Sequence, residues 1–304
     1  MGRLSVFVLG SGAGGGVPQW NCACAVCELA WSGSPRVKPR TQASIAVSAG
    51  AAAGASPVIL INASPDLRQQ ILVTPALQPR GLRASPIEAV VLTGGEVDQT
   101  AGLLTLRERG PFALYATQGT LSTLAANPIF GVLAADVVKR HAIGAGEPFA
   151  LPGGIEAELF LVPGKAPLYL EGASPALAAE TEANVGIELS AAGARLVFIP
   201  GAAKLTPAIA ARLAGADAVM FDGTLFTDDE MIAAGAGSKT GRRMGHMPVS
   251  GPDGTLAALK GMARRRILIH INNTNPILIE DSAERRAVEA AGFEVAEDGM
   301  RIEL

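Results

Sequence analysis

The stretch from Val90 to Leu104 constrains the fold of this chain most, because it predicts a strand that turns sharply into a helix. Val90–Leu92 is a short apolar run, typical of a buried strand. Three small residues break that run, and leucines recur in a helix expected over 100–107. Ligands of α/β proteins bind beyond the carboxyl ends of such strands. The corner is therefore a candidate ligand site, with a solvated, capped turn as the alternative. Its polar side chains are Glu96, Asp98 and Gln99.

Further apolar runs predict a protein of alternating strands and helices. We expect strands at 4–9, 58–61, 113–116, 155–162, 185–189, 195–199, 218–221 and 267–269, and another at the end of 40–48. The last of these pairs with 58–61 through a turn over 49–57. We expect helices from Pro65, capped by Ser64, and over 120–126, 207–214 and 281–291. The Pro- and Ala-rich segment 163–182 predicts an exposed loop or lid. No linker is evident, so we expect one domain over residues 1–304.

Composition excludes several classes of function. Hydrophobic residues make up 49% of the chain and aromatic residues only 4%, which predicts a large aliphatic core. The net charge is −3 without a long basic run, so we expect no nucleic-acid partner. The basic run 264–266 is interpreted as a solvated strand entry. No apolar stretch approaches the ~20 residues of a membrane span. The run 4–9 is too short for a signal-peptide core, so we expect a cytoplasmic protein.

A glycine-rich loop follows the first expected strand. Gly10, Gly12 and Gly15 match the spacing of the dinucleotide-binding fingerprint. That fingerprint requires a helix directly after the loop, whereas Pro18 and then a cysteine cluster follow here. We therefore reject dinucleotide binding.

All three cysteines of the chain lie close together. Cys22, Cys24 and Cys27 form a Cys-x-Cys-x-x-Cys loop within residues 20–28. They cannot form a disulfide framework, and thiolates at this spacing can turn toward one Zn²⁺ ion. A water, a distant carboxylate or His141 would supply the fourth ligand. The alternative is three small buried thiols.

Four metal-capable side chains lie at strand ends or loops elsewhere in the chain. Because carboxyl ends of parallel strands meet at one edge of a sheet, we expect a shared site. Carboxylate and imidazole groups suit Fe, Mn or Zn. His141 has no such context and is expected to be exposed, and Asp66 either faces this site or only favours a helix start. The four residues are Asp98, Asp222, His246 and His270.

The corner resembles the metal-binding corner of the metallo-β-lactamase superfamily, where a strand ends in Thr-His-x-His-x-Asp-His. On that pattern Gly94 and Glu96 occupy the first two His positions, Asp98 keeps the Asp, and Gln99 replaces the last His. Longer sequence stretches, spread along the whole chain, resemble the coenzyme PQQ synthesis protein B family, a branch of this superfamily. They are Val8-Leu9-Gly10-Ser11-x-Ala13-Gly14-Gly15-Gly16-Val17-Pro18-Gln19-Trp20-Asn21-Cys22, Arg40-Thr41-Gln42, Asn62-Ala63-Ser64-Pro65-Asp66-x-Arg68-Gln69-Gln70, Phe221-Asp222-Gly223-Thr224 and His270-Ile271-Asn272-Asn273-Thr274-Asn275-Pro276.

The resemblance implies a four-layer αββα sandwich with a metal cleft at one edge and a structural zinc at the three cysteines. It places Asp98, Asp222 and His270 on superfamily metal positions and Glu96 at a modified first-site position. His246 resembles the second-shell or catalytic His of tRNA 3′-processing nucleases. Gln99 departs from the family, which carries His there, and a neutral amide is a weaker donor for Fe²⁺. As catalytic residues we expect Asp98, Asp222, His246 and His270.

The family acts in the biosynthesis of pyrroloquinoline quinone (PQQ). The resemblance implies iron- and O₂-dependent hydroxylation of a tyrosine in a Glu- and Tyr-bearing peptide cut from the precursor. Few protein ligands leave the open metal positions that such an oxidoreductase needs. One alternative is a non-catalytic carrier for PQQ or its precursor, with a transport role, and another is a zinc hydrolase of the wider superfamily. The oligomeric state is open, with a homodimer as one alternative.

Overall fold

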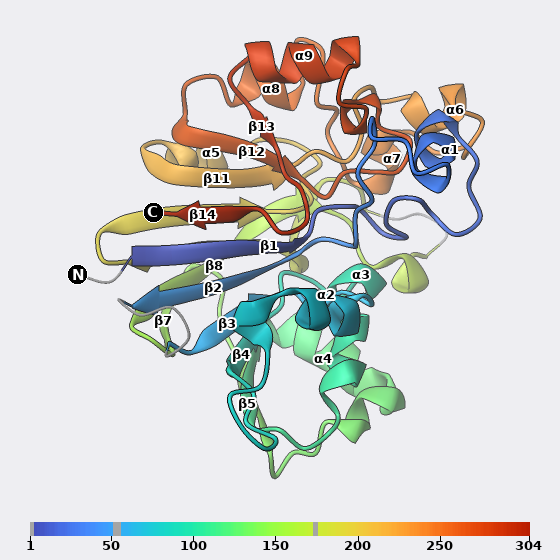
Figure 1. The fold of residues 1–304 in the computed structure, drawn as a ribbon. Coiled ribbons are helices and arrows are strands. Elements are labelled where there is room, and N and C mark those ends of the chain that lie inside the picture. The colour runs from blue at the N-terminus through green and yellow to red at the C-terminus, as the bar shows by residue number, and fades with distance from the viewer. Residues whose placement is uncertain (1–2, 51–55, 173–175) are drawn as a thin grey trace.

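Two sheets lie face to face with helices on both outer sides (Figure 1). The computed structural model describes residues 3–50, 56–172 and 176–304. The strand order of the first sheet is β14-β1-β2-β3-β4-β5-β6 and that of the second is β13-β12-β11-β10-β9-β8-β7. This architecture confirms the expected αββα sandwich. No helix in the described ranges is long and apolar enough to cross a membrane.

The first sheet contains β1 (Arg3–Gly10), β2 (Ser44–Gly50), β3 (Val58–Ile61), β4 (Ile87–Val91), β5 (Phe112–Ala116), β6 (Val138–Ala142) and β14 (Arg301–Glu303). The second contains β7 (Pro148–Leu151), β8 (Ile155–Gly164), β9 (Ala179–Ala191), β10 (Ala194–Ile199), β11 (Ala216–Asp222), β12 (Ala263–Ile269) and β13 (Glu294–Val295). The helices are α1 (Ala25–Trp31), α2 (Leu67–Val73), α3 (Val97–Thr100), α4 (Gln118–Ala126), α5 (Pro207–Leu213), α6 (Glu230–Ala233), α7 (Gly241–Met244), α8 (Thr255–Ala258) and α9 (Ala283–Ala290).

Each sheet has a parallel half that carries the site. Strands β3 to β6 run parallel in the first sheet, and β10 to β13 run parallel in the second. The carboxyl ends of β4, β11 and β12 therefore lie toward one end of the sandwich, where α1, α3 and α7 also gather (Figure 1). The antiparallel pairing of β2 with β3 confirms the predicted hairpin. Part of its predicted turn, 51–55, lies outside the described residues.

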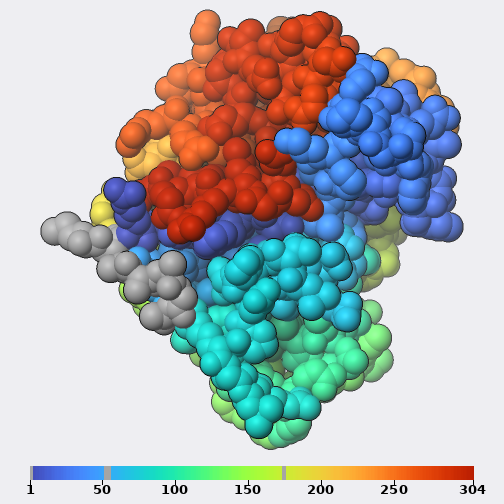
Figure 2. Space-filling model, in the orientation of Figure 1, coloured from blue at the N-terminus to red at the C-terminus, as the bar shows by residue number. Residues whose placement is uncertain are grey.

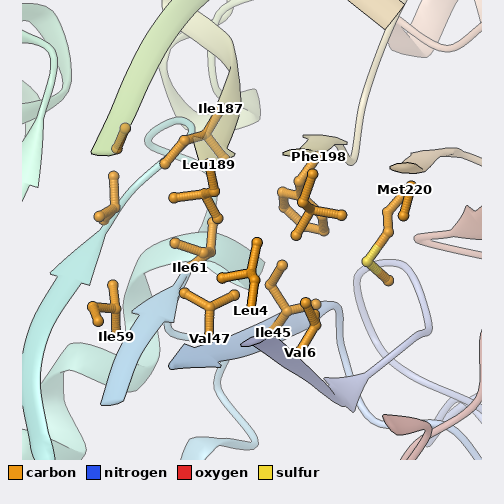
Figure 3. Close-up of a cluster of buried hydrophobic side chains, with 14 of the residues drawn as sticks. Leu4, Val6, Ile45, Val47, Ile59, Ile61, Ile187, Leu189, Phe198 and Met220 are labelled. Carbon is orange, nitrogen blue, oxygen red and sulfur yellow. The ribbon is translucent and has the colours of Figure 1, made fainter. Parts of the chain in front are cut away.

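Aliphatic side chains fill the space between the sheets. In β1 the residues at alternate positions are buried, as period-2 patterning requires. They meet inward-facing residues of the second sheet (Figure 3), which confirms the aliphatic core expected from the composition. Figure 3 labels Leu4, Val6, Ile45, Val47, Ile59 and Ile61 from the first sheet and Ile187, Leu189, Phe198 and Met220 from the second. Two outer clusters join α2 and α4 to the first sheet and α5 and α9 to the second.

The two ends of the chain lie side by side in the first sheet. Strand β14 pairs antiparallel with β1, with Val6 opposite Ile302. Figure 2 shows the red C-terminal segment against the dark blue N-terminal strand. The edge strand of this sheet thus comes from the last residues described.

Several predicted boundaries are wrong. The corner helix begins earlier than predicted, as α3, and continues as a 3₁₀ helix over Ala101–Leu106. The helix expected from Pro65 begins at Leu67 as α2, and the hydroxyl of Ser64 makes no capping bond. Residues 264–266 lie inside β12 rather than before it. The helix after the glycine loop begins only at Ala25, which confirms the rejection of the dinucleotide fingerprint.

The predicted lid over 163–182 is only partly a loop. Strand β8 extends to Gly164, a 3₁₀ turn covers Leu168–Leu170, and β9 already begins at Ala179. Residues 173–175 lie outside the described residues. The early part of β9 escaped prediction because its residues 180–182 are exposed and polar, so only backbone pairing with β8 reveals the strand.

Gly102 fixes the corner helix against the loop that follows β3. Its amide donates to Ala63 O at 2.8 Å, and a Cβ atom on it would lie 2.1 Å from Ser64 O. Because backbone rather than a flexible side chain fills this space, Gly102→Ala should destabilise the protein by roughly 1–3 kcal/mol. Urea unfolding measures the change. Gly131→Ala is the matched control, since no atom lies within 4 Å of its Cβ position. Equal stability of both variants would contradict this account of the packing.

Candidate metal sites

Two polar side chains of the corner after β4 form hydrogen bonds and an ion pair that stabilise the corner and its neighbours. Gln99 Oε1 accepts from Glu96 N at 3.2 Å, and Gln99 Nε2 donates to Thr93 Oγ1 at 3.3 Å. Glu96 Oε1 lies 3.1 Å from Lys165 Nζ and accepts from Leu168 N at 3.1 Å. The structure therefore shows Gln99 as a capping group and Glu96 in an ion pair. That either binds metal stays a prediction.

Asp98 instead points across to the second sheet. Its Oδ2 lies 2.9 Å from Nε2 of His270, the residue that follows β12. His270 has a positive φ of 60°, a backbone conformation that is uncommon for a residue with a side chain. Strain of this kind is concentrated at functional sites. The predicted meeting of Asp98 and His270 is thus present in the structure.

Asp222 is fully buried at the end of β11 and holds His246. Its Oδ2 lies 2.7 Å from His246 Nδ1 and accepts from Ala202 N at 2.8 Å. The other oxygen, Oδ1, accepts from the Thr224 hydroxyl at 2.6 Å. The rings of His246 and His270 are stacked with centroids 5.3 Å apart. One ligand atom from each of Asp222, His246 and His270 lies within 4.8 Å of the others.

Thr224 orients the second imidazole, a role that the sequence analysis missed. Its hydroxyl makes its shortest contact as a donor to Asp222, so its oxygen accepts from His270 Nδ1 at 2.9 Å. That tautomer leaves the lone pair of His270 Nε2 facing the carboxylate of Asp98. Two acceptors at this separation require a proton or a metal cation between them. The donor set thus fits a divalent metal.

The histidines hold both carboxylates ionised. Burial alone would raise the pKa of Asp98, but the hydrogen bond and charge of His270 outweigh burial and lower it. Burial would also raise the pKa of Asp222. The charge and hydrogen bond of His246 outweigh this effect, so the pKa of Asp222 is lowered as well. Burial would lower the pKa of His270, but the hydrogen bond with Asp98 raises it. Ionised carboxylates beside imidazoles form a site for a cation.

The histidines open onto a cavity of about 560 Å³, a size that holds a small organic ligand. The predicted lid forms one wall through Lys165, Leu168 and Tyr169. The Tyr169 hydroxyl donates to Gly95 O at 2.6 Å, which ties this wall to the corner. Asp66 does not line the cavity, because its carboxylate accepts from Gln42 N and Nε2.

The three cysteines form a second cluster. The sulfur atoms of Cys22, Cys24 and Cys27 lie within 4.8 Å of one another. Asn273 Nδ2 lies 3.1, 3.7 and 3.3 Å from them, and Cys24 Sγ donates to Asn273 O at 3.3 Å. His141 is wrong as a fourth ligand, because it lies exposed on the edge strand β6 and stacks on Tyr115. Asn273 is the neighbour that the sequence analysis missed.

Comparisons with known proteins agree with this fold. A model of the beta-lactamase superfamily domain matches residues 58–271. The chain is 56% identical to coenzyme PQQ synthesis protein B of Methylorubrum populi, covering 99% of this chain and 100% of that one. It is similar to the crystal structure of Zn²⁺-bound PqqB from Methylobacterium extorquens, with a TM-score of 0.95, 55% identity and coverage of 99% and 100%.

Similarity in fold extends to more distant proteins. A diphosphatase of the PhnP family has a TM-score of 0.67 at 22% identity, covering 99% of this chain and 97% of that one. The short form of human tRNase Z has a TM-score of 0.57 at 14% identity, with 98% of each chain covered. At these identities the likeness concerns the fold alone.

A buried carboxyl group supports the loop between the two clusters. Glu230 Oε1 accepts from the Thr274 hydroxyl and Oε2 from Phe226 N, each at 2.6 Å. Burial raises the pKa of Glu230 to about 7. Because this folded-state pKa lies above the ordinary value of 4.5, the folded protein loses stability as pH rises from about 4.5 through about 7.

Glu230→Gln should remove this loss. Relative to the parent, the variant should gain on the order of 3 kcal/mol between pH 5 and pH 8. Urea unfolding at the two pH values measures it. The exposed Glu108→Gln variant serves as a control and should follow the parent. A Glu230→Gln protein with the parent's pH dependence would contradict the prediction.

Proposed function

Because this chain belongs to the coenzyme PQQ synthesis protein B family of the metallo-β-lactamase superfamily, we propose that it hydroxylates a tyrosine during PQQ biosynthesis. The substrate is a peptide that contains Glu and Tyr and derives from the precursor. The reaction depends on Fe²⁺ and O₂. One oxygen atom enters the phenol ring, the other leaves as water, and an external reductant supplies two electrons. We also propose that the protein works in the cytoplasm.

The donor set in the cleft is the observation that carries this proposal. Two imidazoles and a carboxylate, from His246, His270 and Asp222, are the combination typical of non-haem iron oxygenases. Asp98 adds a second carboxylate oxygen beside His270 Nε2. Iron held by these residues would supply the redox chemistry that activates O₂. Zinc in the same place could not, because it has no redox chemistry.

The residues around the donor set have separate tasks. Thr224 fixes the tautomer of His270, and Asp222 fixes the orientation of His246. The apolar side chains of Val97, Leu168 and Met244 line the cavity and offer a surface for an aromatic ring. Such a surface holds a phenol near the donor set and limits the water around it.

The structure disfavours the zinc-hydrolase alternative. A dinuclear hydrolase of this superfamily needs a first histidine at the position of Gly94. A Cβ atom there would lie 2.5 Å from Gln99 Oε1 and 2.8 Å from Ala183 O, so a side chain has no room. A carrier of PQQ or its precursor is the other alternative, and it differs from the hydroxylase in leaving its ligand chemically unchanged.

The test is anaerobic loading with Fe²⁺ followed by a Glu-Tyr peptide, ascorbate and O₂. The peptide should gain one oxygen atom in the mass spectrum. Gln99→His should bind Fe²⁺ ~10–100-fold more tightly and raise the yield, because imidazole is the stronger donor. Gln99 must also give up its bonds to Glu96 N and Thr93 to reach a metal. His270→Ala should abolish both iron binding in the cleft and oxygen gain.

His141→Ala, which removes an exposed imidazole of β6 that does not line the cavity, should match the parent in both measurements. An unchanged peptide in the presence of demonstrably bound iron would exclude the hydroxylase for this substrate and favour the carrier. Equal iron affinity of the parent and Gln99→His would show that residue 99 is not a ligand.

We further propose that the cysteine loop binds a structural zinc. Three cysteine sulfur atoms and the amide of Asn273 converge there, outside the cavity onto which the histidines open. Cys24→Ser should release about one zinc per chain and lower the melting temperature, since structural zinc contributes directly to folding. Elemental analysis and calorimetry measure the two effects. Unchanged zinc content and melting temperature would show that the cysteines are three buried thiols without a metal.

A further inference from the structure

One wall of the cavity includes the 3₁₀ turn Leu168–Leu170. Beside this turn, several cationic side chains surround one carboxylate. Glu171 is nearly buried and lies 2.8 Å from Lys165 Nζ, 3.4 Å from Arg243 and 4.0 Å from Lys239 Nζ. Lys165 also pairs with Glu96 at 3.1 Å. The group therefore contains three cations and two carboxylates, and it has a surplus of positive charge on the side of the cavity.

Of these cations, Lys239 has the weakest pairing with a carboxylate. Lys165 has two carboxylates within 3.1 Å, and its side chain is only 13% exposed. The one ion pair that Lys239 forms with a described residue has a separation of 4.0 Å, and the Lys239 side chain is 42% exposed. Both lysines line the cavity onto which His246 and His270 open. Within residues 3–50, 56–172 and 176–304, no carboxylate lies closer to this ammonium than that of Glu171 at 4.0 Å.

We propose that Lys239 binds a carboxylate of the ligand that occupies this cavity. The ligand class is an aromatic compound with at least one carboxylate, and its identity as the Glu-Tyr peptide rests on the function proposed above. The apolar lining holds the ring, the donor set faces the reacting end, and Lys239 holds the anionic end. Lys165 has a different task, which is to neutralise Glu96 and Glu171.

The chain connects this lysine to the donor set over a short, anchored path. Thr240 caps α7, which starts two residues after Lys239 and ends before Gly245 and His246. Gly241 N donates to Asp228 O and Arg242 N to Asp228 Oδ1, both at 2.8 Å. Gly245 has a φ of +87°, and Cγ of Lys165 lies 3.2 Å from the position that its Cβ would take. The backbone that follows Lys239 is thus held at a fixed position relative to His246.

The experiment compares a charged ligand with a neutral one on matched variants. Isothermal titration under nitrogen, which prevents turnover, measures the affinity of a Glu-Tyr peptide and of the Gln-Tyr amide that lacks both carboxylates. Lys239→Met should weaken binding of the Glu-Tyr peptide about tenfold and leave binding of the neutral amide unchanged. Lys239→Arg should restore most of the affinity. Lys260→Met, which removes an exposed lysine that does not line the cavity, should match the parent.

The binding measurements either support or overturn the role of Lys239. Equal losses for the charged and the neutral ligand, or no loss with either, would overturn the proposal, as would absence of binding by the parent. Titration of PQQ, which carries carboxylates but needs no oxygenation, separates this proposal from the hydroxylase. If Lys239→Met weakens PQQ binding while the peptide gains no oxygen with the iron-loaded parent, the carboxylate subsite stands and the hydroxylase does not.

Discussion

The contact between Asp98 and His270 is the interaction on which the cleft depends. Asp98 follows β4 of the first sheet, and His270 follows β12 of the second, so their 2.9 Å contact joins the two halves of the sandwich at its edge. This contact lowers the pKa of Asp98 and raises that of His270, so the attraction between the two side chains offsets the cost of burying them. A pair that bridges two sheets can form only when the aliphatic core between them has set their spacing. The site is thus a product of the whole fold rather than of one loop.

The segment 270–275 connects the cleft to the cysteine cluster. Asn272 N donates to Thr224 O at 3.0 Å, and Asn275 Nδ2 donates to Gly223 O at 2.9 Å, so the segment is bound to the end of β11. Between these two anchors, Asn273 contacts all three cysteines. The residue that holds the thiols therefore lies three positions from the imidazole in the cleft. A short piece of hydrogen-bonded backbone thus connects the cysteine loop with His270.

Sequence reasoning identified the residue types of the site and the fold, but not all of the contacts. Asp98, Asp222, His246 and His270 were predictable because metal-capable groups at strand ends are few in this chain. Thr224 and Asn273 were not assigned roles, since a hydroxyl or an amide has many uses and only tertiary structure places one beside an imidazole or a thiol. The start of β9 was missed for a related reason. Its exposed polar residues carry no alternating pattern, and its pairing with β8 is a backbone property.

The corner after β4 departs from the superfamily pattern in the side chains that it can offer to a metal. With glycine at position 94 there is no space for a first-site side chain, and the amide of Gln99 closes that space from the other side. Glu96, the next candidate, forms an ion pair with Lys165, whose second partner is Glu171. The first sheet then contributes Asp98 as its single carboxylate aimed at the donor set, whereas the second contributes Asp222, His246 and His270. The imidazoles of His246 and His270 open onto the cavity that Lys165 and Lys239 also line, so the basic side chains and the donor set face one space.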